Sequence, residues 1–152
     1  MIIQVNAENV AEYREIFDLC MKGYKSDEGG HLLPTLDVDY FLKTWTHYLM
    51  LHLGTIFVLL DEAGKAVGTL GAVKYPEPNS GAMMACELFW YVLPEYRGDG
   101  MGLLREYEAW AKESGCRYAS VVHLMGEMAD VMKRVYERKG YIAREVHYTK
   151  EV

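Results

Sequence analysis

Cysteine and proline are scarce in this 152-residue sequence, which contains three Cys and four Pro. Three widely spaced cysteines fit neither a disulfide framework nor a zinc site, and the five histidines show no metal-ligand spacing, so we expect a reducing, cytoplasmic environment and no metal. No apolar run approaches the ~20 residues that a membrane-spanning helix requires, and the N-terminal segment soon becomes acidic. We therefore expect neither a membrane anchor nor an export signal.

An excess of positive charge is also missing. Sixteen Lys and Arg face 22 Asp and Glu, which gives a formal net charge of -6 at pH 7. The resulting field repels phosphate backbones, so the charge disfavours general nucleic-acid binding and favours small cationic partners. With 51% hydrophobic and 25% charged residues, the chain can bury one core, and we expect a single domain over residues 1–152.

The spacing of apolar residues predicts the element order β-α-α-β-β-β-α-β-α-β, with a loop over residues 24–36. Gly23 should end the first helix, and Asp37 should open the second. The strands are expected at residues 2–5, 55–60, 66–75, 85–92, 118–125 and 141–151, and the last two helices at 101–114 and 129–139. This order includes a βαβ crossover, which indicates an α+β or α/β domain with a mixed, mostly antiparallel sheet.

The most informative segment connects the strand that ends at Val92 to the helix that opens near Met101, and it reads L-P-E-Y-R-G-D-G-M-G. Closely spaced glycines let the backbone approach a ligand, and the first turn of the following helix offers N–H groups and a positive dipole end to an anion. Leu103 stands where the dinucleotide fingerprint needs its third glycine, and a Walker loop needs Lys followed by Ser or Thr. A phosphate-binding turn of another type and a plain glycine-rich connection both remain open.

Two ordered motifs give the sequence a family resemblance. The stretch E-L-F-W-Y-V-L-P-E-Y-R-G-D-G-M-G resembles motif A of the GCN5-related N-acetyltransferase (GNAT) superfamily, V-x-P-x-x-R-G-x-G-x-G, and V-Y-E-R-K-G-Y at 135–141 looks like its late signature F-Y-E-K-x-G-F. The resemblance covers residues 55–152 and is nearest to small phage-type acetyltransferases. It implies a GNAT-like α+β (α/β) fold with a mixed, mostly antiparallel central sheet of six or seven strands and about four flanking helices.

The resemblance also implies acetyl-CoA as cofactor. Its diphosphate would lie on the glycine turn, and its pantetheine arm would pair with the end of the motif A strand. The cofactor-binding residues carried over from the motif are Val92, Leu93, Arg97, Gly98, Asp99, Gly100, Met101 and Gly102. Asp99 stands where the family commonly has Lys or Arg, and a carboxylate there should weaken binding unless it points to solvent.

By the same resemblance, the reaction is direct attack of a primary amine on the thioester in a ternary complex. A β-bulge and a splay of the strands ending at Val92 and running through Val121 would expose a backbone N–H to the thioester carbonyl. Glu87 is the candidate base, acting through a water, although some relatives carry this Glu one position earlier, at Cys86 here, and a paired strand carboxylate is an equal alternative. Tyr136 is the candidate acid, and its alternative is an aromatic packed in the core.

The acceptor is expected to be a small-molecule or peptide amine, favoured as a cation by Asp27, Glu28, Asp37 and Asp39 on the acceptor side. Its identity stays open among polyamines, aminoglycosides, amino acids, peptide N-termini and protein lysines. Two other functions compete: a catalytically silent acyl-CoA-binding module, and a site for another phosphate-bearing ligand such as a nucleotide. A homodimer is a further expectation from the family alone.

Overall fold

The computed structural model describes residues 1–26, 37–124, 126, 128–150 and 152. Its centre is a five-stranded sheet with the order β1-β2-β3-β4-β5, in which only the β4–β5 pair is parallel. The strands are β1 (Ile2–Val5), β2 (Gly54–Leu60), β3 (Ala66–Pro76), β4 (Met83–Val92) and β5 (Tyr118–Ser120). The mixed, mostly antiparallel sheet predicted from the sequence is therefore confirmed.

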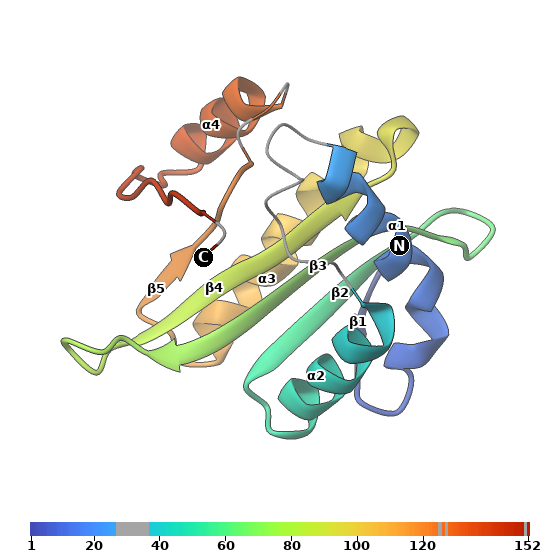
Figure 1. Ribbon diagram of the computed structural model, residues 1–152, viewed down its shortest axis with the longest axis horizontal. Coiled ribbons are helices and arrows are strands. Elements are labelled where there is room, and N and C mark those ends of the chain that lie inside the picture. The colour runs from blue at the N-terminus through green and yellow to red at the C-terminus, as the bar shows by residue number, and fades with distance from the viewer. Residues whose placement is uncertain (27–36, 125, 127, 151) are drawn as a thin grey trace.

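Helices cover both faces of this sheet (Figure 1). They are α1 (Arg14–Ser26) and α2 (Val38–Met50) on one face and α3 (Met101–Glu113) on the other face, and α4 (Ala129–Arg138) follows β5 in the chain. Two 3-10 helices, η1 (Val10–Tyr13) and η3 (Pro94–Asp99), lead into α1 and α3. The segment β4-η3-α3-β5 is the predicted βαβ crossover, so the end of β4 and the start of α3 lie at one edge of the domain.

Two apolar clusters hold the layers together. The cluster under α3 includes Leu70, Leu103, Leu104, Tyr107 and Tyr136, and the cluster under α1 and α2 includes Ile16, Phe17, Trp45, Ile56, Val58 and Phe89. Most of these side chains are less than 5% exposed. Because β4 contributes Phe89 to one cluster and Trp90 packs against the other, both faces of β4 are fixed by packing.

Three predicted boundaries are wrong. Residues 141–150 form no strand, so the sheet has five strands among the described residues rather than six or seven. The strand predicted at 118–125 ends at Ser120, and α1 continues past Gly23 to Ser26. The rest of the predicted 24–36 loop, residues 27–36, lies outside the described residues. Glycine stops a helix only when the backbone turns there, and the positive-φ glycines of the described residues are Gly64, Gly81, Gly115 and Gly140.

A β-bulge interrupts β4 next to the predicted base. Gly71 of β3 pairs with Phe89 and Ala72 pairs with Glu87, which leaves Leu88 as the extra residue on β4. A Cβ added to Gly71 would lie 2.1 Å from the Phe89 ring. The bulge therefore depends on a glycine opposite a buried aromatic ring.

Gly71→Ala should destabilise the fold by about 1–3 kcal/mol, because the buried ring has to move to admit the new methyl group. Urea unfolding followed by far-UV circular dichroism measures the change. Gly98→Ala is the matched control, since a Cβ at Gly98 meets no atom within 4 Å. Equal unfolding midpoints for the two variants would contradict this account of the bulge.

The described residues contain neither a candidate membrane span nor a candidate metal-binding cluster. No helix in this part of the chain has the length and apolar character needed to cross a membrane. No group of three or more His, Cys, Asp or Glu side chains there is arranged to hold a metal ion.

Candidate active site

The site begins where β4 and β5 separate. Their parallel pairing joins Met84 to Tyr118, Ala85 to Ala119 and Cys86 to Ser120, and it stops just before the bulge at Leu88. Beyond this point, β4 continues to Val92 without β5 beside it. The bulge and the splay implied by the resemblance are thus both present.

The backbone at the end of β4 faces the resulting opening. The Leu93 N–H donates to the Val67 carbonyl at 2.9 Å, so this residue uses its amide within the sheet. The backbone N–H and C=O groups of adjacent residues in a strand point to opposite sides. Val92, which is opposite Gly68, therefore directs its N–H and C=O groups away from β3. Of the two residues predicted to pair with pantetheine, Val92 is the one whose backbone faces the open edge.

The three glycines of the turn have different surroundings. An added Cβ would lie 3.0 Å from Val92 Cγ2 at Gly100 and 2.6 Å from Ile2 Cδ1 at Gly102, whereas at Gly98 it would meet nothing within 4 Å. None of the three adopts a positive φ. Gly100 and Gly102 therefore allow close packing at the start of α3, and Gly98 leaves the backbone open to a ligand.

One cavity of about 970 Å³ joins the glycine turn to the predicted catalytic residues. It is lined by Val92, Arg97, Gly98, Gly100 and Met101 and also by Glu87 and Tyr136. Asp99 and Gly102 line a second cavity, of about 1160 Å³, together with Ile2 and Arg105. Leu93 lines neither cavity among the described residues. Asp99 is exposed and does not line the first cavity.

Glu87 is buried at the bulge, with 2% of its surface exposed. Its Oε2 accepts a hydrogen bond from the Val122 N–H at 3.0 Å, across the gap between the separated strands. Burial raises the pKa of Glu87 to about 7, and the hydrogen bond from Val122 opposes this shift only in part. The carboxyl group therefore gains and loses its proton near neutral pH.

Tyr136 bonds to the other backbone group of Val122. Its hydroxyl donates to the Val122 carbonyl at 2.8 Å, and its buried ring packs near Trp90 and Tyr141. Burial raises the pKa of Tyr136 well above its usual range, and the nearby charge of Glu87 adds to the shift. The phenol therefore stays protonated and can act as a hydrogen-bond donor at any physiological pH.

The structure also places residues at the site that the sequence did not reveal. Val122 links Glu87 to Tyr136 through its backbone, and the His123 ring lies 6.3 Å from the Tyr136 ring while lining the same cavity. A group that we call the aromatic floor lines the cavity below α1 and α2; it comprises Phe17, Phe41, Trp45 and Phe89. Helical spacing of Phe41 and Trp45 predicted only that they face inward.

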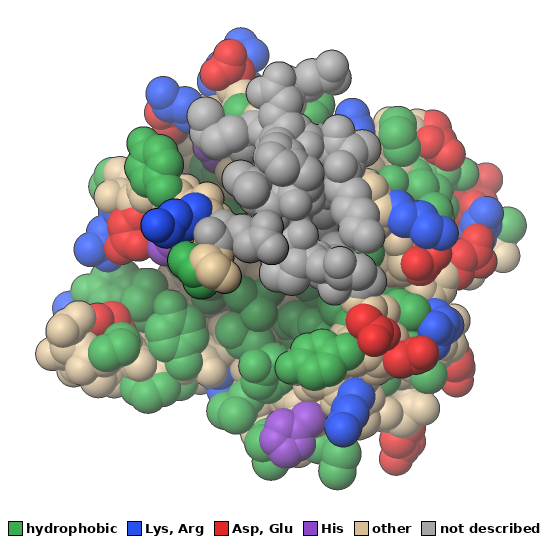
Figure 2. Space-filling model, viewed as in Figure 1, with side chains coloured by type: hydrophobic (Ala, Val, Ile, Leu, Met, Phe, Trp, Pro, Cys, Tyr) green, Lys and Arg blue, Asp and Glu red, His purple; other side chains and the backbone are tan. Residues whose placement is uncertain are grey.

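The floor rings are in mutual contact. The ring centroids of Phe17 and Phe41 are 5.0 Å apart, those of Trp45 and Phe89 5.1 Å, and those of Phe41 and Phe89 5.3 Å. Figure 2 shows apolar side chains at the bottom of a hollow on this face of the molecule. The floor is thus a packed aromatic cluster built from α1, α2 and β4, and Phe41 is its partly exposed member.

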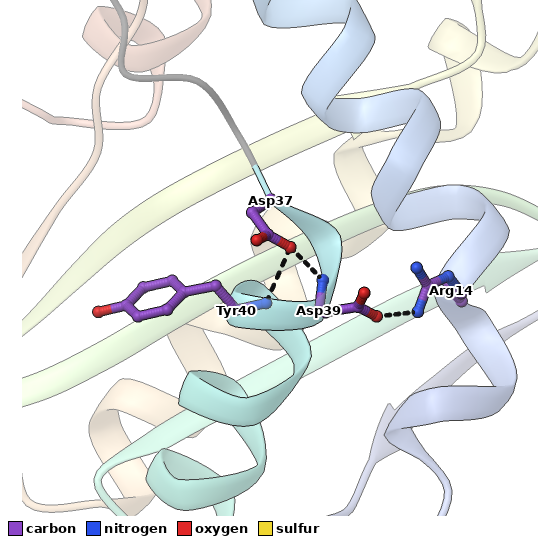
Figure 3. Close-up of polar contacts among 4 residues, drawn as sticks. All are labelled: Arg14, Asp37, Asp39 and Tyr40. Atoms are coloured by element: carbon purple, nitrogen blue, oxygen red, sulfur yellow. Dashed lines mark hydrogen bonds and ion pairs between the residues drawn. The ribbon is translucent and has the colours of Figure 1, made fainter.

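Two of the carboxylates predicted to favour a cationic acceptor make contacts within and between α1 and α2 (Figure 3). Asp37 caps α2, since its Oδ1 accepts from the N–H groups of Asp39 at 2.9 Å and Tyr40 at 3.2 Å. Asp39 pairs with Arg14 of α1 at 2.6 Å. Neither lines the cavity, and the other two predicted carboxylates, Asp27 and Glu28, lie outside the described residues.

The profile of the acetyltransferase (GNAT) family matches residues 12–141, so the chain belongs to this family. Solved acetyltransferases share the fold. An aminoglycoside acetyltransferase, HMB0005, from an uncultured soil metagenomic sample is 14% identical with a TM-score of 0.76, covering 100% of this chain and 97% of its own. A predicted acetyltransferase from Clostridium acetobutylicum with acetyl-CoA is 16% identical with a TM-score of 0.75, covering 99% and 95%.

A third structure, AAC(6')-Iy in complex with the bisubstrate analog CoA-S-monomethyl-acetylneamine, is 19% identical with a TM-score of 0.71, and the match covers 100% of this chain and 98% of the other. At these identities the likeness establishes the fold. No protein with a curated description matches the sequence significantly.

Proposed function

We propose that this protein is an acetyl-CoA-dependent N-acetyltransferase that transfers the acetyl group to a primary amine by direct attack in a ternary complex. The observation that carries the proposal is the single cavity in which the open Gly98 turn and the free edge of β4 meet Glu87 and Tyr136. Membership of the GNAT family supports acetyl-CoA as the cofactor, as do structural neighbours with acetyl-CoA or a CoA analog.

The chain has groups that fit this cofactor. Arg97 is exposed at the cavity, Gly98 leaves its backbone accessible, and the first turn of α3 starts at Met101, where backbone N–H groups favour a diphosphate. The outward-facing backbone of Val92 suits the amides of a pantetheine arm. Acetyl-CoA supplies a thioester-activated acetyl group. The remaining predicted cofactor residues, Leu93, Asp99 and Gly102, have supporting rather than contacting positions in this proposal.

Glu87 would accept the proton that the amine loses on attack, directly or through a water. Alkyl amines with a pKa of about 10.4 are almost fully protonated at neutral pH, so the reaction needs a base. A carboxyl group with a pKa of about 7 is about half deprotonated at pH 7, and its carboxylate is a stronger base than an ordinary glutamate. Leu88 breaks the ladder next to Glu87, which is where the predicted oxyanion-stabilising N–H would lie.

Tyr136 would donate a hydrogen bond to the leaving sulfur. Its raised pKa keeps the phenol protonated, and its hydroxyl group is already directed toward the Val122 backbone at the gap between the strands. Complete proton transfer to a thiolate is uphill for such a weak acid, so we assign the hydroxyl as a donor that stabilises developing charge.

A catalytically silent acyl-CoA-binding module is the second candidate. It is favoured by one observation: Glu87 and Tyr136 both bond to the Val122 backbone, an arrangement that fixes the strands without any chemistry. Release of free thiol from acetyl-CoA across a broad amine panel separates the two candidates. Turnover supports the enzyme, and its absence in a protein that binds CoA supports the module.

Thermal unfolding with different ligands tests the cofactor. CoA at about 100 times its dissociation constant should stabilise the protein by about 2.7 kcal/mol, whereas ATP and NAD at the same concentration should shift the unfolding temperature much less. A larger shift with ATP or NAD than with CoA would contradict the proposal and favour another phosphate-bearing ligand.

Cytoplasmic location and a homodimer stay predictions. None of the three cysteines forms a disulfide. Ile142, Val146 and Tyr148 are 84%, 72% and 94% exposed, so the C-terminal segment offers apolar side chains to a second copy. Size-exclusion chromatography with light scattering at micromolar concentration measures the oligomeric state.

A further inference from the structure

We infer that Tyr141 and Glu108 of α3 position Tyr136 for its role at the leaving sulfur. The inference rests on the proposed acetyltransfer and deepens it by naming two positioning residues of that reaction. Neither of the two lines the cavity that holds Glu87 and Tyr136, so both would act through Tyr136 and not on a substrate.

Helix α4 carries Tyr136 and has few buried side chains. Tyr136 is the only buried residue of this helix, all of whose residues the structure describes. Met132 and Val135 pack against the same core cluster but stay partly exposed. A segment with few buried apolar contacts moves more easily than a core element. The place of the Tyr136 hydroxyl therefore depends on what fixes the end of α4.

The C-terminal end of α4 joins Tyr141 directly to Tyr136. Gly140 adopts a φ of +87°, and its N–H donates to the Glu137 carbonyl at 3.0 Å. The Tyr141 N–H donates to the Tyr136 carbonyl, also at 3.0 Å, and the centroids of the two rings are 5.7 Å apart. The two backbone bonds and the left-handed glycine form a Schellman motif, in which the residue after the glycine packs on the last turn of the helix. A shift of the Tyr141 ring therefore moves the Tyr136 ring.

Glu108 holds Tyr141 from α3. Its Oε1 accepts a hydrogen bond from the Tyr141 hydroxyl at 3.3 Å, and its Oε2 pairs with Lys139 Nζ at 3.0 Å. The side chains of Glu108 and Lys139 are each 32% exposed, so water screens their pairing less than it screens an exposed surface pair. Burial and the charge of Glu108 raise the pKa of Tyr141 above its usual range, so its hydroxyl stays a donor. One carboxylate thus holds the residues on both sides of Gly140.

The contacts with Glu108 are not part of the late signature F-Y-E-K-x-G-F. That signature has Phe at the position of Tyr141 and leaves the position of Lys139 open. A phenylalanine would keep the ring contact and the Schellman motif and lose the bond to Glu108. Tyr141→Phe therefore removes the anchoring contact and leaves the rest of the helix end in place.

The experiment measures kcat by release of free thiol from acetyl-CoA with the fastest amine of the panel. Tyr141→Phe should lower kcat by roughly 5- to 20-fold, less than the ~100-fold loss that a displacement of about 1 Å can cause, and leave the KM for acetyl-CoA unchanged. Glu108→Gln should have a similar effect, since an amide bonds Tyr141 more weakly and does not pair with Lys139. Both defects should shrink with an aryl thioester donor, whose more acidic thiol needs less help to leave.

Glu137→Gln is the matched control, because it makes the same change in another ion pair of α4. Glu137 lies 4.0 Å from Lys133, and their side chains are 55% and 59% exposed. This variant should keep the native kcat with both donors. Far-UV circular dichroism checks that each variant is folded.

The double substitution Tyr136→Phe, Tyr141→Phe separates positioning from a general effect on the fold. Once the Tyr136 hydroxyl is absent, loss of the Tyr141 hydroxyl should cause no further decrease in kcat. A further decrease in the double variant, equal defects with both donors, or a native kcat in Tyr141→Phe and Glu108→Gln would each overturn the inference and leave acetyltransfer intact. No thiol release by the native protein with any amine, together with CoA binding, overturns the proposed function and the inference with it.

Discussion

Glu87→Gln should lower kcat by about 10²- to 10⁴-fold, the usual contribution of a positioned general base. The amide oxygen of Gln can still accept the Val122 N–H, so the strand gap keeps its geometry while the side chain loses its ability to take up a proton. Rates of thiol release at saturating acetyl-CoA and acceptor measure the loss. An unchanged kcat would exclude Glu87 as the base.

The pH profile distinguishes a base from a structural carboxylate. Because the pKa of Glu87 is about 7, the ratio of native to variant kcat/KM should rise about tenfold per pH unit below pH 7 and level off above it. Taking the ratio removes the titration of the amine, which is common to both proteins. A ratio that does not change with pH would assign Glu87 a purely structural role.

The contribution of Glu87 to the free energy of unfolding should fall as the pH rises, whereas its contribution to kcat/KM should increase. The folded protein holds the Glu87 proton up to about pH 7, whereas the unfolded chain releases it near 4.5. The folded state binds more protons between these values, so the contribution of Glu87 to stability is present at low pH and is lost as the pH rises through about 7. Urea unfolding should therefore show Glu87→Gln gaining stability relative to the native protein between about pH 5 and about pH 8.

Tyr136→Phe should lower kcat by about 10²-fold and cost about 1 kcal/mol of stability, because the ring stays in place while the hydroxyl group and its bond to the Val122 carbonyl are lost. The defect should shrink with an aryl thioester as acetyl donor, since its more acidic thiol leaves with less help. A defect that is the same for both donors would contradict a role at the leaving group.

Tyr107→Phe is the matched control for this prediction. Tyr107 is buried, its hydroxyl donates to the Ser120 carbonyl at 2.8 Å, and burial likewise raises its pKa above the usual range. It does not line the cavity among the described residues. Tyr107→Phe should thus lose a similar amount of stability and keep its kcat. This result would separate a catalytic role of Tyr136 from the loss of a hydrogen bond to a backbone carbonyl.

Much of the fold could be predicted from the sequence, because its longer elements carry clear apolar periodicity. The helix from Asp37 was predicted with its cap, and the strand that ends at Val92 was predicted with its glycine turn. Alternation in residues 141–151 failed as a strand signal, because alternation reports the preference of a chain and not the presence of a partner. The described residues of that segment pair with no other strand.

The site could be predicted only at the positions that motifs mark. Glu87 and Tyr136 were predicted separately, and the sequence gives no sign that both bond to the backbone of Val122. That contact depends on the extra residue at Leu88 and on the early end of β5, and both are set by register between distant segments. The aromatic floor was hidden for a related reason: a core position and a cavity-lining position have the same helical spacing.

The shared contact with Val122 has a consequence for the energetics of catalysis. Glu87 accepts from the N–H of this residue and Tyr136 donates to its carbonyl, so both side chains act on the same transition state from one backbone position. The penalties of the two single substitutions should then overlap, and the double substitution Glu87→Gln, Tyr136→Phe should cost less in kcat than the product of the separate losses. The base and the hydrogen-bond donor would then act as one coupled pair, because both bond to the backbone of Val122.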